Sequence, residues 1–146
     1  MIKWESIEPK LGSWAPYFKP FYDIGGFEDI YLELRKQGKT LKVLPESKDL
    51  FKCFELCPAK ELKCIWVGQD PYPMVSQGVV VADGLAFSCS YTKKEQPSLK
   101  LIYNAIERDL WDGFNLSMLR EPNLAPLATQ GVLLLNPSHK SLSMAL

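Results

Sequence analysis

The chain has 146 residues, a hydrophobic content of 47% and a formal net charge of zero at pH 7. These values are typical of a single globular domain, residues 1–146, and they exclude a protein that binds nucleic acid through a general basic excess. No apolar run is long enough to span a bilayer, and Glu5 interrupts any secretory signal, so we expect a cytoplasmic protein, or a nuclear one in a eukaryote. The four cysteines form no CxxC pair, which favours reduced thiols over a metal site.

Four segments are predicted before the first buried strand. Residues 1–22 are rich in aromatic residues and proline, which predicts short helices that pack their rings onto the domain. A helical pattern runs from the glycines at 25–26 to Gly38. Residues 41–45 are extended, and Ser47 is the predicted N-cap of a helix that ends before Pro58.

The middle of the chain predicts two strands and a long loop. Residues 63–67 are branched, aromatic and apolar, which suits a buried strand, and a loop containing Asp70 and Tyr72 follows it. Residues 74–83 are interpreted either as an edge strand or as a hydrophobic flap. Residues 84–89 form a second short apolar run, which we take as a strand.

The last third of the chain predicts two helices and one strand. Apolar residues recur at helical spacing from Pro97 to Leu110, and a shorter helix is expected over 123–130. A continuous apolar strand over 132–135 ends in Asn136. Because apolar strands alternate with helices, the sequence predicts an α/β domain with a parallel sheet covered on both faces.

The predicted strand ends carry four side chains that suit one pocket, namely those of Asp70, Tyr72, Phe87 and Asn136. The carboxyl ends of parallel strands meet at one edge of a sheet, which is where ligands bind. A carboxylate, two aromatic rings and an amide suit an uncharged planar heterocycle such as a nucleobase. The glycine-rich phosphate loop of a flavodoxin-like nucleotide or redox protein is not found.

Four motifs resemble, in order, successive motifs of the family 1 uracil-DNA glycosylases. They are Gly68-Gln69-Asp70-Pro71-Tyr72, Gly84-Leu85-Ala86-Phe87-Ser88, Pro97-Ser98-Leu99-Lys100 and Gly131-Val132-Leu133-Leu134-Leu135-Asn136. The resemblance implies a three-layer α/β/α fold with a short central parallel sheet. It also implies a DNA repair enzyme that flips uracil out of DNA and hydrolyses its N-glycosidic bond without a cofactor or metal. This reaction is the first step in base excision repair of this kind of DNA damage.

The resemblance also implies a role for each pocket residue. Asp70 would position the attacking water and stabilise the cationic sugar, whereas Gln69 would contribute mainly backbone contacts. Tyr72 would exclude thymine by a clash with its methyl group, and Phe87 would stack on the uracil ring. Asn136 would pair with the polar edge of uracil, accepting from N3 and donating to O4.

Pro97 and Ser98 would bind a DNA phosphate at the start of their helix. Each assignment has a structural alternative. Ser98 is equally well explained as a helix cap, Asp70 as a turn residue, and Phe87 as a core side chain.

The sequence departs from the family pattern in three ways. Pro73 replaces a histidine, and the following loop is lengthened around residues 79–81. Family members continue beyond the strand at 132–135 to a further strand and a late His-Pro-Ser loop, but this sequence ends at Leu146, and His139 is interpreted as a solvated residue.

We therefore expect the last strand and the histidine and leucine loop to be absent and the activity to be impaired by several orders of magnitude. One electrostatic group of this kind is worth about 10²–10³-fold or more. The alternative function is that of a catalytically weak relative that binds uracil, DNA or a protein. We also expect self-association through an uncovered sheet edge at residues 132–135.

Overall fold

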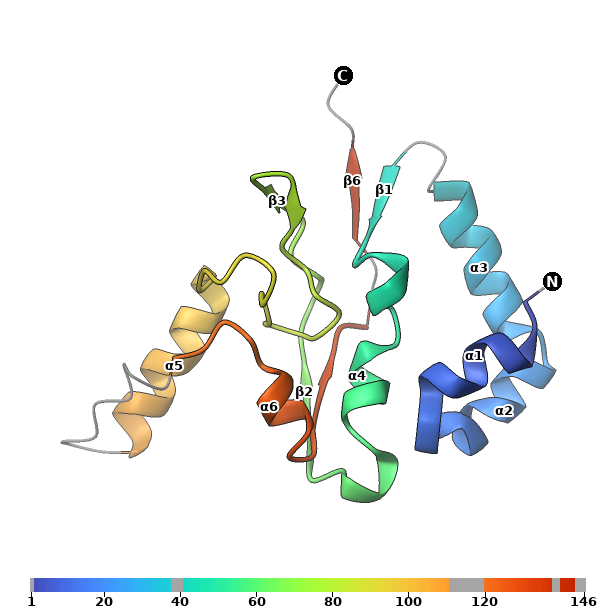
Figure 1. The fold of residues 1–146 in the computed structure, drawn as a ribbon, viewed down its shortest axis with the longest axis horizontal. Helices are drawn as coiled ribbons and strands as arrows, with labels where there is room; N and C mark the ends of the chain where they lie inside the picture. The colour runs from blue at the N-terminus through green and yellow to red at the C-terminus, as the bar shows by residue number, and fades with distance from the viewer. Residues whose placement is uncertain (1, 38–40, 111–119, 138–139, 144–146) are drawn as a thin grey trace.

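The computed structural model describes residues 2–37, 41–110, 120–137 and 140–143. Two parallel strands lie at the centre of the ribbon, with the helices of residues 97–110 and 125–128 to one side and the helices between residues 4 and 56 to the other (Figure 1). In the described part of the chain, no helix is long and apolar enough to cross a membrane. This arrangement confirms the predicted α/β class with helices on both sides of a short parallel sheet.

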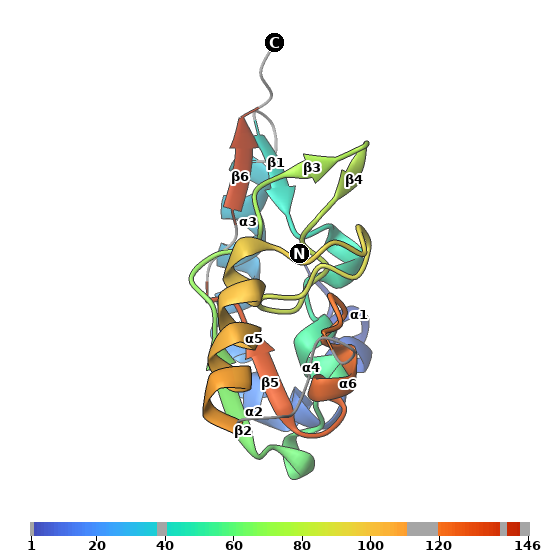
Figure 2. The ribbon, with the colours of Figure 1, turned by 90° about the vertical axis from the view of Figure 1, so that its left-hand side faces the viewer.

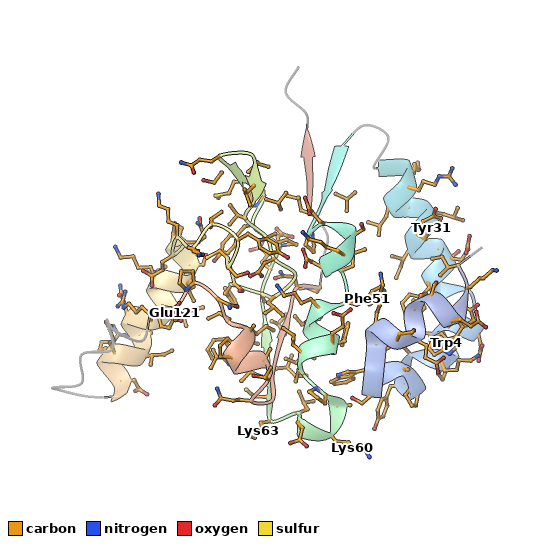
Figure 3. The ribbon with its side chains drawn as sticks, viewed as in Figure 1. Trp4, Tyr31, Phe51, Lys60, Lys63 and Glu121 are labelled. Atoms are coloured by element: carbon orange, nitrogen blue, oxygen red, sulfur yellow. The ribbon has the colours of Figure 1, made fainter. Side chains whose placement is uncertain are left out.

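The N-terminal third is helical and aromatic, as the sequence predicts. It contains α1 (Trp4–Leu11), a 3-10 turn η1 (Gly12–Trp14), α2 (Ala15–Asp23) and α3 (Gly26–Gln37). Rings from α2 and α3 meet rings of the next segment, and the Phe18 and Phe54 centroids are 5.1 Å apart in an edge-on contact. Phe51, labelled in Figure 3, extends this cluster to Phe27, at 6.1 Å. The predicted packing of the N-terminal rings is confirmed.

A short strand and a broken helix follow. Strand β1 (Leu41–Leu44) leads to the 3-10 turn η2 (Ser47–Asp49), α4 (Lys52–Leu56) and the 3-10 turn η3 (Ala59–Glu61). The prediction of one helix capped by Ser47 is wrong, because the turn begins after Glu46 and the helix after Phe51, neither with a side-chain cap. Asp49 instead turns inward and is buried.

The central sheet joins β2 (Cys64–Val67) to β5 (Val132–Leu135) in parallel, with Cys64 opposite Val132. Helices α4 and α6 (Ala125–Ala128) both contact β5. Leu133 and Leu134 are therefore buried, which explains the continuous apolar sequence of this strand. Figure 3 labels Lys60 and Lys63 at the opposite end of β2 from the loop that carries Asp70.

Strand β5 has no second strand partner among the described residues, so the uncovered edge at residues 132–135 stays a prediction, whereas the exposed side chains of this sheet lie on β2. Ile65 and Val67 are 50% and 60% exposed, whereas no residue of β5 is exposed. Helices α4 and α6 contact β5, so the exposed apolar side chains of this two-stranded sheet belong to β2.

The undecided segment 74–83 forms a hairpin, β3 (Val75–Ser76) and β4 (Val79–Val80). Its two turn residues, Gln77 and Gly78, have φ of 50° and 78°, as a tight two-residue hairpin requires. The hairpin projects beyond the carboxyl ends of β2 and β5 (Figures 1 and 2).

Residues 84–89 do not form the predicted strand. Gly84 and Phe87 have positive φ, which bends the chain into a turn, and only the Ala86 amide bonds to β5, on the Leu134 carbonyl at 3.1 Å. The long helix predicted from Pro97 is confirmed as α5 (Pro97–Leu110).

Near the end of the chain, β6 (Lys140–Ser143) pairs with β1 in antiparallel orientation, which the sequence did not predict. His139 lies outside the described residues.

Candidate functional site

The loop after β2 begins with a close approach between two segments. The Gly68 amide donates to the Leu135 carbonyl at 2.9 Å and so extends the parallel pairing by one residue. A Cβ on Gly68 would lie 2.3 Å from Asn136 Oδ1 and 3.1 Å from Ala86 Cβ. Only glycine fits there without displacing Asn136, although Gly68 was not among the predicted site residues. Its position directly after an apolar strand was the available signal.

Tyr72 links this loop to the turn that carries Phe87. Its hydroxyl donates to the Phe87 carbonyl at 3.2 Å. Burial raises the pKa of the Tyr72 hydroxyl to about 12, so the phenol stays neutral at ordinary pH. The ring is half-buried and forms a wall without charge. The structure thus connects two of the predicted site residues directly.

A hollow of about 350 Å³ opens at the carboxyl end of β2. It is lined by Gln69, Asp70, Pro71, Tyr72, Pro73, Phe87 and Ser98. Five of the seven predicted site residues therefore share one hollow, although they come from three separate segments. A carboxylate, two rings and a helix-start hydroxyl converge there. Pro97, the sixth, is exposed at the start of α5 and does not line the hollow.

Asn136, the seventh predicted residue, lines a neighbouring cavity of about 320 Å³ that is mostly apolar. Pro71 borders both spaces. The Asn136 Oδ1 atom is buried and, among the described residues, has no hydrogen-bond partner. A buried amide oxygen without a hydrogen bond lowers the stability of the fold, so Asn136 Oδ1 is a candidate acceptor for a hydrogen bond from a ligand. The structure does not bring Asn136 into the hollow that holds Asp70.

A buried carboxylate that is not among the predicted site residues, Asp83, lies at the start of the turn that carries Phe87. It is fully buried and accepts hydrogen bonds from Ser88 and Ser90. An aspartate inside an otherwise apolar run was the signal that could have identified it.

Metal-binding groups are not assembled in the described residues. No cluster of three or more histidine, cysteine, aspartate or glutamate side chains there is placed to hold a metal ion. The four cysteines are free, and burial raises the pKa of the Cys53 thiol to about 12.

Comparison with known proteins identifies relatives of the chain. A uracil-DNA glycosylase of Campylobacter jejuni (strain RM1221) is 37% identical over 111 residues, which are 73% of this chain and 45% of the relative. A uracil-DNA glycosylase of Amoebophilus asiaticus (strain 5a2) is 35% identical over 124 residues, 85% of this chain and 53% of the relative. This chain is related to the uracil-DNA glycosylases. It spans about half the length of the curated relatives that it matches. No protein-family model matches it.

Solved structures show that the fold is shared. The crystal structure of the mimivirus uracil-DNA glycosylase matches with a TM-score of 0.75 and 22% identity, covering 97% of this chain and 51% of the other. A second mimivirus structure, in complex with UGI, also gives a TM-score of 0.75, at 24% identity, over 89% of this chain and 48% of the other. The predicted uracil-DNA glycosylase-like fold is confirmed over this part.

Proposed function

We propose that this chain is a uracil-DNA glycosylase, which hydrolyses the N-glycosidic bond of uracil in DNA as the first step of base excision repair. The observation that carries the proposal is the hollow in which Asp70, Tyr72 and Phe87 converge. Sequence relatives that bear the name of this enzyme support it. The substrate is DNA that contains uracil, and the compartment is the cytoplasm, or the nucleus of a eukaryote.

Asp70 is the proposed catalytic residue. Bond cleavage leaves positive charge on the sugar, and a carboxylate held in position stabilises that charge without reorganisation. The same carboxylate orients the water that attacks the sugar carbon. Asp70 lines the hollow and is partly exposed, which suits a group that must meet both the sugar and solvent.

Tyr72 and Phe87 are the proposed binding groups for the base. The Phe87 ring stacks on uracil, and the neutral Tyr72 ring closes the space beside C5, where thymine carries a methyl group. The hydrogen bond from Tyr72 to the Phe87 carbonyl fixes the two segments relative to each other. Gln69 lines the same hollow and contributes backbone contacts to the base.

Asn136 is the proposed reader of the polar edge of uracil. Its Oδ1 atom lacks a partner in the described part of the chain, as expected of an acceptor kept for a ligand. Asn136 lines a separate cavity that shares Pro71 with the hollow, so this role requires the two spaces to join at Pro71 when the base enters.

Pro97 and Ser98 are the proposed phosphate contacts. Both are exposed at the start of α5, and Ser98 also lines the hollow. The amides of the first turn of a helix favour an anion, so a phosphate next to the flipped nucleotide can bind there.

A single-turnover assay tests the proposed function. Protein in excess is incubated with a single-stranded oligonucleotide that contains one uracil, and alkali then cleaves any abasic site. Asp70→Asn should reduce product at least about 10²-fold, whereas Asp109→Asn, an exposed aspartate of α5, should leave it unchanged. Folded wild-type protein that gives no product, or product that does not depend on Asp70, would contradict the proposal. Uracil-DNA binding without cleavage would instead favour a catalytically weak binding relative.

The exposed strand β2 supports the proposal that two copies of this chain associate. Ile65 and Val67 present apolar side chains on a strand whose only described partner is β5. Such a strand is a template for pairing with a second copy of the chain.

A further inference from the structure

Asp83 presents an energetic problem that its surroundings must solve. Its side chain is 0% exposed, in a region whose neighbours, Ala82, Leu85 and Ala86, are also buried. A carboxylate in such a place is stable only when donors satisfy its oxygens. The proposed catalytic groups do not include Asp83, so its retention inside the fold calls for another explanation.

The donors to Asp83 lie on both sides of Phe87 along the chain. Its Oδ2 atom accepts from Ser88 Oγ at 2.6 Å, from the Ser90 amide at 2.9 Å and from Ser90 Oγ at 2.6 Å. Its Oδ1 atom accepts from the Leu85 amide at 3.3 Å. The carboxylate therefore holds the chain before and after Phe87 in one closed arrangement.

Phe87 has a backbone conformation that needs this support. Its φ is 65°, in the left-handed region that a bulky side chain rarely adopts, and such strain persists only where the surroundings over-determine it. The conformation brings the ring to the hollow, whereas the adjacent Ala86 and Ser88 are buried. Relaxation to negative φ would redirect the ring.

Two further contacts anchor this arrangement to the rest of the domain. Lys52 Nζ donates to the Asp83 carbonyl at 2.7 Å and lies 4.0 Å from its Oδ2 atom, which supplies positive charge from α4. Ser88 Oγ, besides donating to Asp83, accepts from the Leu124 amide at 3.1 Å. The turn is thus tied to α4 and to Leu124, the residue before α6.

We propose that Asp83 is a positioning residue: its carboxylate holds the Phe87 backbone in the left-handed conformation that presents the ring for stacking on a flipped base. The ligand in this inference, uracil, rests on the proposed function, whereas the effect on the Phe87 backbone does not. Asp83 acts through Phe87 and touches no reacting atom.

Three variants distinguish positioning from a general contribution to stability. Asp83→Ala removes all four hydrogen bonds. Asp83→Asn can keep the three on Oδ2 by placing its amide oxygen there, although its amide nitrogen then faces the Leu85 amide. Asp49→Asn is the matched control, since Asp49 is also buried but binds the Tyr91 hydroxyl, at 2.8 and 3.0 Å, outside the Phe87 turn.

The first measurement is the one-bond coupling between Cα and Hα of Phe87 in labelled protein, which distinguishes a left-handed, positive φ from a negative φ. We expect the left-handed value in wild type and Asp49→Asn, its loss in Asp83→Ala, and its retention in Asp83→Asn. If Asp83→Ala does not fold, Ser90→Ala removes one donor side chain and should give a smaller shift of the coupling in the same direction. An unchanged coupling in the folded variants overturns the proposal.

The second measurement is the inhibition constant of free uracil, with uracil binding followed directly if no turnover occurs. It should rise about tenfold in Asp83→Ala, within the range for losing one base–aromatic stack, and return close to the wild-type value in Asp83→Asn. A lower melting temperature with unchanged uracil affinity overturns positioning in favour of a purely structural role. If wild type neither releases nor binds uracil, the proposed function fails, and the Phe87 coupling still decides whether Asp83 positions this residue.

Discussion

Replacing Gly68 with alanine tests the packing that sets the position of Asn136. A Cβ there would lie 2.3 Å from Asn136 Oδ1, a distance that real structures do not tolerate, and 3.1 Å from Ala86 Cβ, which requires a shift of a few tenths of an ångström. Asn136 must therefore rotate or β2 and β5 must separate. Overpacking of this kind typically costs about 1–3 kcal/mol.

The expected loss of stability can be measured by thermal and urea unfolding. At this chain length, each kcal/mol lowers the melting temperature by roughly 3–4 °C, so the decrease should be about 3–12 °C. Uracil release should also fall, by about 5- to 150-fold, because a displaced amide loses contacts that are worth about 1–3 kcal/mol.

The double variant Gly68→Ala/Asn136→Ala is the decisive control. Removing the amide removes the 2.3 Å contact, so alanine at position 68 should cost much less in this background. Equal costs in both backgrounds would refute the packing argument and leave the Ala86 contact or the strand pairing as the cause. No cost in either background would refute it as well.

Three other predictions follow from the described contacts. Tyr72→Ala should allow release of thymine from DNA, measured with a thymine-containing oligonucleotide, and continued exclusion would contradict the wall role of Tyr72. Burial raises the pKa of the Cys53 thiol to about 12, so its contribution to stability is complete below its ordinary pKa near 9 and declines as pH rises from there towards 12. Between these values, urea unfolding under reducing conditions should show a pH slope that Cys53→Ala makes shallower by up to about 1.4 kcal/mol per pH unit. Replacing both Ile65 and Val67 with threonine should reduce self-association in sedimentation velocity, and unchanged association would exclude β2 as the contact.

The regular elements could be predicted where a local pattern decides the structure. The helical spacing from Pro97 to Leu110 and the apolar run before Asn136 each specify one element. The pairing of β1 with β6 joins segments far apart in the sequence, and no local signal indicates it. Phe87 shows a second limit of prediction from sequence. The apolar run at residues 84–89 predicts a strand, whereas the positive φ of Phe87 bends the chain into a turn.

The structure brings five of the seven predicted site residues to one hollow, but it places Asn136 elsewhere. Strand ends on a parallel sheet bring Asp70 and Tyr72 to the expected edge, but the shape of the space depends on side-chain packing. Because Asn136 packs against Gly68, it lines the apolar cavity rather than the hollow. That packing could not be read from residue types.

The hollow depends on backbone geometry as much as on the side chains that line it. Gly68 lets the ends of β2 and β5 approach each other, and the left-handed backbone of Phe87 brings its ring to the hollow. The Tyr72 hydroxyl joins these two segments by bonding to a main-chain carbonyl rather than to a side chain. On the proposed function, a substitution at a lining residue changes one contact with the base, whereas a change at Gly68 or Asp83 moves the residues whose positions depend on it. We therefore expect substitutions at Gly68 and Asp83 to weaken uracil binding although neither residue lines the hollow.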